Sequence, residues 1–157
     1  MNRCFSVVLL CLIMMFCIAC VSTQSNQLKI QQLAEHGDAG AQYDLGWKYF
    51  KGEGVPKDDV QAVAWFRKAA DQGDADAQYT LGGMYGLGKG VAMDVVQSYM
   101  WIELAANQGH AKAIDARKKI TEVLTTSQIE EGQRLSREWS AAHHKSNGQL
   151  DLELRRF

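Results

Sequence analysis

A gapless internal repeat constrains the fold of this chain more than any other feature. Residues 37–72 align with residues 73–108, and 19 of the 36 aligned positions are identical. The copies begin GDAGAQYDLGWKYFKGEGV and GDADAQYTLGGMYGLGKGV, and they end WFRKAADQ and WIELAANQ. A third copy starts at GHAKA, residues 109–113, and then degenerates. Repeats of this period are typical of stacked helical hairpins, so we expect an all-α fold.

Aspartate and glycine bound the first helix of each copy. Asp38 and Asp74 follow a glycine, where a carboxylate can accept hydrogen bonds from the free amides of a helix start. Gly52 and Gly88 lie where the apolar periodicity stops, and glycine at a helix end favours positive φ. The pattern therefore predicts one helix between each aspartate and the glycine that follows it.

The second helix of each copy is expected to pack closely on the first. Gly46 and Gly82 lie inside the first helix, where glycine costs about 1 kcal/mol relative to alanine. We interpret them as positions where the partner helix approaches. Asp58 and Asp94 are predicted to cap the second helix. Its expected buried face comprises Trp65, Phe66, Ala69 and Ala70, repeated as Trp101, Ile102, Ala105 and Ala106.

The shared pattern AQYxLGxxYxxGxGVxxDxxQxxxWxxxAAxQG resembles the Sel-1-like repeat family, a relative of the tetratricopeptide repeats. The resemblance covers roughly residues 30–113. It implies a short right-handed α/α solenoid of stacked helical hairpins. Arg117 and Lys118 stand where the family has Leu-Gly, so the third copy is expected to be a capping helix. A further helix over 127–142, with Thr126 or Ser127 as N-cap, is expected to close the open end of the solenoid.

The first twenty residues have the composition of an export signal. Arg3 precedes a continuous apolar run from Phe5 to Val21, which is short for a membrane-spanning helix. An uncleaved membrane anchor is the alternative. All four cysteines lie in this segment, so the rest of the chain has no thiols for disulfides or cysteine metal sites: Cys4, Cys11, Cys17 and Cys20.

The end of this run resembles a bacterial lipoprotein signal. Ala19 supplies the small residue that precedes a lipidated cysteine, and Cys20 supplies the thiol. The resemblance implies lipidation of Cys20 and a membrane tether, and Val21 in place of aspartate implies the outer membrane. Cys17 stands where such signals prefer leucine, which leaves ordinary cleavage after Ala19 or Ser22 open.

These features divide the chain into four parts. We assign residues 1–19 to a signal peptide, 20–27 to a tether, 28–145 to the repeat domain and 146–157 to a tail. Within the repeat domain, 109–145 holds the degenerate copy and the cap. In the tail, leucines alternate with charged residues, which indicates either a strand-like segment or a frayed terminus: Leu150, Leu152 and Leu154.

Bulky side chains change helix between the two copies. Trp47 and Phe50 of the first copy become Gly83 and Gly86 in the second. The second helix gains bulk instead, with Val63 and Ala64 replaced by Tyr99 and Met100. We interpret the exchange as compensated packing at constant core volume. The alternative is that Trp47 and Phe50 line a binding face.

Four lysines of the first copy are apolar in the second. Lys48, Lys51, Lys57 and Lys68 become Met84, Leu87, Met93 and Leu104. Either the C-terminal helix covers these four apolar side chains, or they form an exposed patch for a partner, where methionine adapts easily.

No catalytic constellation is evident in the sequence. The stretch GGMYGLGKG, residues 82–90, approaches a nucleotide-binding P-loop, but that motif needs a preceding strand, and here a helix is expected. The pattern Ser-x-x-Lys of penicillin-recognising enzymes does not occur. A net charge of −1 gives no electrostatic reason to expect nucleic-acid binding.

We therefore expect a non-enzymatic adaptor or scaffold of the bacterial cell envelope, as the family resemblance implies. Its partner would be another protein or peptide, with membrane attachment through Cys20 and no cofactor, metal or nucleotide. Two alternatives stay open. One is a cell-wall or β-lactam hydrolase related to cysteine-rich members of the family, and the other is a secreted factor that contacts a host.

Overall fold

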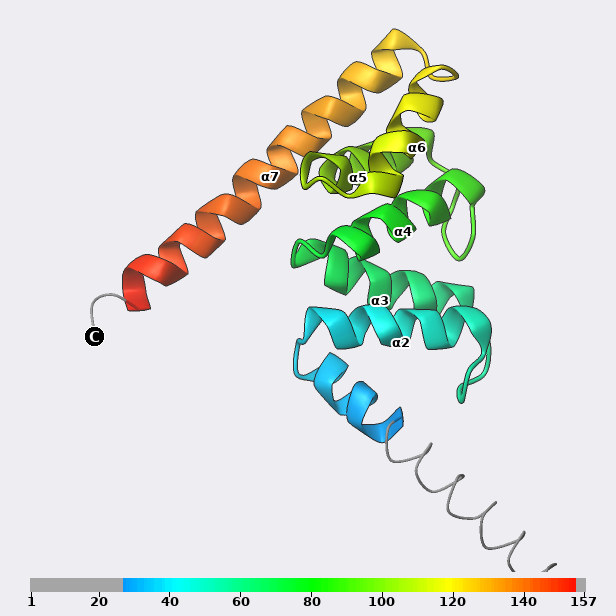
Figure 1. Cartoon of the computed structure of the whole chain (residues 1–157), viewed down its shortest axis with the longest axis vertical. Helices are drawn as coiled ribbons and strands as arrows, with labels where there is room; N and C mark the ends of the chain where they lie inside the picture. Colours follow the sequence, from blue (N-terminus) through cyan, green and yellow to red (C-terminus); the bar gives the residue numbers. More distant parts are fainter. Residues whose placement is uncertain (1–26, 155–157) are drawn as a thin grey trace, which may run out of the picture.

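The computed structural model describes residues 27–154, which form a row of packed helices (Figure 1). A helical stretch over residues 27–35 comes first. The helices that follow are α2 (Ala39–Lys51), α3 (Asp59–Asp71), α4 (Ala75–Leu87), α5 (Val95–Asn107), α6 (Ala111–Thr121) and α7 (Thr126–Leu154). α2 packs on α3 and α4 packs on α5 as hairpins, and α3 packs on α4 to join them. The predicted short α solenoid is confirmed.

The predicted helix boundaries of the two full copies are also confirmed. Oδ1 of Asp38 accepts a hydrogen bond from the Ala41 amide at 2.7 Å, and Asp74 repeats this bond to Ala77. Asp58 and Asp94 cap α3 and α5, each accepting two backbone hydrogen bonds. Gly52 and Gly88 end α2 and α4 with φ of 76° and 63°, a conformation that favours glycine.

Gly46 in α2 and Gly82 in α4 are close-contact positions, as predicted. A Cβ at Gly46 would lie 2.6 Å from Cε1 of Phe66 on α3. A Cβ at Gly82 would lie 2.7 Å from Cγ1 of Ile102 and 3.0 Å from the carbonyl oxygen of Ser98, both on α5. The two helices of each hairpin therefore approach more closely than any other residue type would allow.

Buried glutamines link successive hairpins, a feature that the sequence patterns did not predict. Gln78 on α4 is fully buried and donates to the carbonyl of Ala70 at 3.1 Å. Its own oxygen accepts from Gln108, at the end of α5, at 2.8 Å. Gln42 makes the equivalent bonds, to Ala34 and from Gln72. Because Gln42 bonds Ala34 as Gln78 bonds Ala70, the stretch over 27–35 occupies the place of a preceding second helix.

The third copy departs from the hairpin geometry. His110 caps α6 by accepting from the Ala113 amide at 3.1 Å. Lys118 occupies the position that Gly82 has in α4, so a second helix cannot close on α6 as α5 closes on α4. α7 packs on α5 instead, where a Cβ at Gly132 would lie 2.6 Å from the ring of Tyr99. Figure 1 shows α7 crossing α5 and then leaving the body of the solenoid.

One expectation about the C-terminal region is wrong. The N-cap of α7 is Thr125, not Thr126 or Ser127, because Thr125 and Gln128 exchange side-chain and backbone hydrogen bonds in a capping box. The backbone of α7 stays helical to Leu154, so of the two alternatives for the leucines of the tail the strand-like segment does not form. No proline lies within the helix, so its backbone hydrogen bonds can continue without a break.

Compensated packing is the wrong explanation for Tyr99. Its ring packs against Gly132 of α7 and does not fill the space above the glycines of α4. A Cβ at Gly83 would have no atom within 4 Å, so that position is open. The ring of Tyr99 therefore packs on α7. Of the two glycines that replace aromatic residues in α4, Gly83 is open, whereas a Cβ at Gly86 would lie 3.0 Å from Oγ of Ser98 on α5.

The predicted export segment lies outside the described residues. This includes Cys20, its neighbour Ala19 and most of the tether. Within residues 27–154, no helix combines the length and the apolar character that crossing a bilayer requires.

Candidate functional site

Two aromatic side chains near the end of α2 are partly open to solvent. Trp47 and Phe50 lie one turn apart, with ring centroids 5.3 Å apart in an edge-on arrangement. Below them, the buried ring of Phe66 lies 5.5 Å from Trp47 and 5.6 Å from Tyr43. Core contacts therefore hold the two exposed rings in fixed orientations, which lowers the entropy cost of binding a partner.

Three lysines surround these rings. The Nζ atom of Lys51 lies 5.5 Å from the centroid of Trp47. Nζ of Lys57 and Nζ of Lys89 lie 5.9 Å and 5.4 Å from the centroid of Phe50, within the range of cation–π attraction. We call this set, Trp47, Phe50, Lys51, Lys57 and Lys89, the lysine–aromatic surface.

Lys89 belongs to the second repeat, and the turn that follows α4 brings it to the first. Gly90 has a φ of 67°, and a Cβ there would collide with the carbonyl of Asp59 at the start of α3. Only glycine lets the α4–α5 turn settle against α3 in this way. Sequence alignment of the copies could not reveal Lys89, because its partner ring comes from the other copy.

The four apolar replacements of the second copy do not form one surface. Met84 and Leu104 are 5% and 4% exposed and belong to the core on which Leu135 and Trp139 of α7 pack. Leu87 and Met93 are 70% and 69% exposed, and both lie at the α4–α5 turn beside Lys89. Burial therefore accounts for the first pair, and only the second pair is available to a partner.

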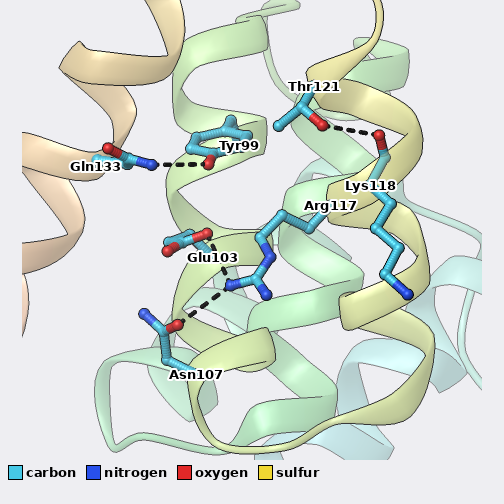
Figure 2. Close-up of polar contacts among 7 residues, drawn as sticks. All are labelled: Tyr99, Glu103, Asn107, Arg117, Lys118, Thr121 and Gln133. Atoms are coloured by element: carbon cyan, nitrogen blue, oxygen red, sulfur yellow. Dashed lines mark hydrogen bonds and ion pairs between the residues drawn. The ribbon is translucent and has the colours of Figure 1, made fainter.

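A polar pocket of about 170 Å³ lies between α5, α6 and α7 (Figure 2). Its lining residues are Tyr99, Glu103, Arg117, Lys118, Thr121 and Gln133. Nη1 of Arg117 lies 3.2 Å from Glu103 and 3.3 Å from Oδ1 of Asn107. Figure 2 shows Arg117 reaching from α6 toward Glu103 on α5, whereas the ammonium of Lys118 extends away along α6. The replacement of Leu-Gly by Arg117 and Lys118 was the sequence signal for this pocket.

Burial raises the pKa of the Tyr99 hydroxyl above its ordinary value, and the Glu103 carboxylate adds to the effect, whereas the hydrogen bond from Gln133 opposes it. Tyr99 therefore loses its proton more readily in the unfolded chain than in the folded protein. Its contribution to stability is complete below the pKa of an unfolded tyrosine, about 10, and is lost as pH rises through the folded-state pKa.

As pH rises above about 10, the free energy of unfolding of Tyr99→Phe should fall less steeply than that of the wild type. Absorbance titration of tyrosinate, combined with urea unfolding at several alkaline pH values, measures both effects. The variant should lack one tyrosine that ionises above pH of about 10. Superimposable alkaline profiles for the two proteins would contradict the assignment.

The other sequence candidates give no assembled site. The P-loop-like stretch runs from the middle of α4 into the turn before α5, so a helix precedes it, as predicted. Among the residues that the structure describes, no group of three or more histidine, cysteine, aspartate or glutamate side chains could hold a metal ion.

Comparison with known proteins identifies the repeats. The Sel1 repeat family matches residues 39–74 and 75–110. The chain is 48% identical over 44 residues to the secretory immunoglobulin A-binding protein EsiB of Escherichia coli O6:H1 strain CFT073, which is 28% of this chain and 9% of EsiB. The match therefore spans a small part of that relative.

Two crystal structures share the fold. One is a protective antigen of uropathogenic Escherichia coli with an SLR fold, at a TM-score of 0.67 and 35% identity over 70% of this chain and 24% of the antigen. The other is a Sel1 repeat protein from Oxalobacter formigenes, at a TM-score of 0.57 and 42% identity over 57% of this chain and 68% of that protein. With two matched repeats, the shared fold and this coverage, the chain belongs to the Sel1 repeat family.

Proposed function

We propose that this protein-interaction repeat module binds a partner polypeptide on the lysine–aromatic surface, without catalysing a reaction. The observation that carries the proposal is the pair of partly exposed rings, in which Trp47 packs on the buried ring of Phe66 and Phe50 packs on Trp47. Tryptophan and other aromatic anchors in fixed orientations supply much of the binding energy in protein interfaces.

The difference between the two repeats supports this location. The first repeat presents Trp47 and Phe50, and the second has Gly83 and Gly86 at the same positions. A solenoid that needed these aromatic rings only for packing would need them in both repeats. We therefore place the main contact on the first hairpin, with Leu87 and Met93 at its border.

Localisation is a second part of the proposal. The apolar run before Cys20 supports export to the bacterial envelope, with lipidation of Cys20 and attachment to the periplasmic face of the outer membrane. Incorporation of labelled palmitate in cells, with Cys20→Ala as the control, tests this part separately from partner binding.

Partner capture tests the binding surface. Crosslinking in intact cells followed by pull-down should recover a protein partner, and Trp47→Ala should weaken its capture about tenfold or more, because truncation of a hot-spot aromatic typically costs 2 kcal/mol or more. Phe50→Ala should weaken capture in the same direction. Equal capture by wild type and both variants would place the interface elsewhere.

Trp65→Ala is the matched control. Trp65 is also half-buried, and Nζ of Lys68 lies 3.8 Å from its ring centroid, but it lies on α3 outside the lysine–aromatic surface. Its replacement should leave capture unchanged. Turnover of nitrocefin or muropeptides by the purified protein, abolished by a point change, would contradict the proposal of binding without catalysis.

A host protein is the second candidate partner. The observation in its favour is the similarity to EsiB, whose name records binding of secretory immunoglobulin A. Surface plasmon resonance with purified secretory immunoglobulin A tests this candidate. Binding that Trp47→Ala weakens would favour the host partner over one in the bacterial envelope.

A further inference from the structure

We propose that the lysine–aromatic surface selects an acidic segment of its partner, in which carboxylates alternate with apolar side chains. The inference rests on the proposed function and names the ligand chemistry of the same surface. It depends on the lysines, whereas the proposed function depends on the aromatic rings.

Two of the three lysines form no ion pair with the side chains that the structure describes. Lys51 has a carboxylate neighbour in Glu53, at 3.7 Å, and both side chains are more than half exposed. Across the side chains that the structure describes, residues 27–143, neither Lys57 nor Lys89 has a carboxylate within 4.0 Å. Both ammonium groups are therefore available to pair with a carboxylate of a partner, although Asp58 and Asp59 follow Lys57 in the sequence.

These two cations converge on one ring from different repeats. Lys57 belongs to the α2–α3 turn and Lys89 to the α4–α5 turn, and both ammonium groups lie within 6 Å of the centroid of Phe50. A carboxylate that a partner places beside Phe50 would therefore lie near both ammonium groups and could pair with either. The tight turn at Gly90 holds Lys89 in this position, although no described carboxylate lies within 4.0 Å of its ammonium group.

The aromatic rings of the surface determine which side chains of the partner should accompany its carboxylates. Trp47 and Phe50 offer apolar area between the lysines, and Leu87 and Met93 extend it along the α4–α5 turn. Figure 1 shows the α2–α3 and α4–α5 turns on the same side of the molecule. A chain segment that crosses both turns would place acidic and apolar side chains on the surface in alternation.

The position of the rings favours a polypeptide over a lipid bilayer. Both rings are partly buried in the solenoid and pack on the core, so they do not project as membrane-inserting aromatics do. A peptide side chain can reach such recessed rings, whereas an acyl chain in a flat bilayer would be held away by the lysines in front of them.

The experiment uses labelled peptides and the purified repeat protein with its leader removed, residues 20 onward. One peptide has glutamate alternating with leucine or phenylalanine, and the second has glutamine at each glutamate. We expect the protein to bind the first peptide at least about threefold more tightly than the second, by fluorescence anisotropy. Affinity for the glutamate peptide should also fall as salt rises through about 0.1 M, where the Debye length is about 10 Å.

Charge-neutral variants locate the effect. Replacing Lys51, Lys57 and Lys89 together with glutamine should abolish the preference for glutamate, since each exposed charge pair contributes about 0.2–1 kcal/mol and three add to roughly threefold to 150-fold in affinity. The matched control replaces three exposed lysines of α6, with the same change of net charge: Lys112, Lys118 and Lys119. That control should keep the preference, and circular dichroism should show both variants folded.

Each other outcome overturns the inference. Equal binding of the two peptides, or no binding of either, would exclude acidic selection, and the capture assay with Trp47→Ala would still decide the proposed function. Equal losses from the two triple variants would show a general charge effect. Binding to phosphatidylglycerol vesicles that depends on the same three lysines, without peptide binding, would replace the acidic segment by a membrane surface.

Discussion

Replacing Phe66 with alanine is expected to lower the free energy of unfolding by about 3–5 kcal/mol, the usual cost of deleting a buried phenyl ring. Phe66 is fully buried, fills the space above Gly46 and supports the rings of Tyr43 and Trp47. Since small domains have a total stability of about 5–15 kcal/mol, the variant should be marginal at room temperature. Urea unfolding followed by circular dichroism measures the loss.

Phe66→Ile is the informative control. The equivalent position of the second repeat is Ile102, which packs beside Gly82 as Phe66 packs beside Gly46. Isoleucine should therefore fit the α2–α3 hairpin and cost clearly less than alanine. If both variants lost the same free energy, the ring of Phe66 would matter for its aromatic contacts and not for the volume that it fills.

Alanine substitutions at Gly82 and Gly83 are expected to change stability in opposite directions. At Gly82 the new Cβ would lie 3.0 Å from a backbone oxygen of α5, so the hairpin must open, which we expect to cost about 1–3 kcal/mol. At Gly83 a Cβ meets no atom within 4 Å, so the higher helix propensity of alanine should add about 0.5–1 kcal/mol. Thermal unfolding of the two variants measures the difference.

These neighbouring positions control for each other, because both substitutions add one methyl group to the same helix. A loss at both positions would mean that Gly83 also has a close neighbour in solution. A gain at both would mean that α4 and α5 pack less tightly than the structure describes.

The sequence was sufficient to predict the features that depend on local chemistry. A carboxylate before a helix and a glycine after it act within one turn of the chain, so Asp38 and Gly52 could be assigned from their neighbours. The repeat then supplied the pairing of helices, because hairpins of equal length stack on one another. The close approach at Gly82 followed from the cost of glycine inside a helix.

Contacts between separate repeats were not predictable in the same way. Gln78 has the same polar character as any exposed glutamine in the sequence, and only the packed structure shows that it is buried between two hairpins. Lys89 reaches Phe50 because the α4–α5 turn settles on α3. Such contacts depend on how hairpins stack, and helical periodicity carries no information about this stacking.

The sequence singled out part of the candidate site. The other candidates could be assigned to the core or to the surface only from the burial of their side chains. Trp47 and Phe50 differed between the copies and are partly exposed, as a binding face requires. Met84 and Leu87 differ from lysine in the same way, yet one is core and the other is surface. The sequence left open whether the C-terminal helix covers these side chains, and the packing of α7 on the core that contains Met84 decides it for that residue.

The lysine at position 118 determines how long this array can grow. A Sel1 array lengthens when each new first helix accepts a second helix against its glycine, as α4 accepts α5 at Gly82. Lys118 removes that acceptor position, and Tyr99 with Gly132 commits the last helix to α5 instead. Stacking a further hairpin on α6 would therefore require Leu-Gly at positions 117 and 118 and the displacement of α7 from α5.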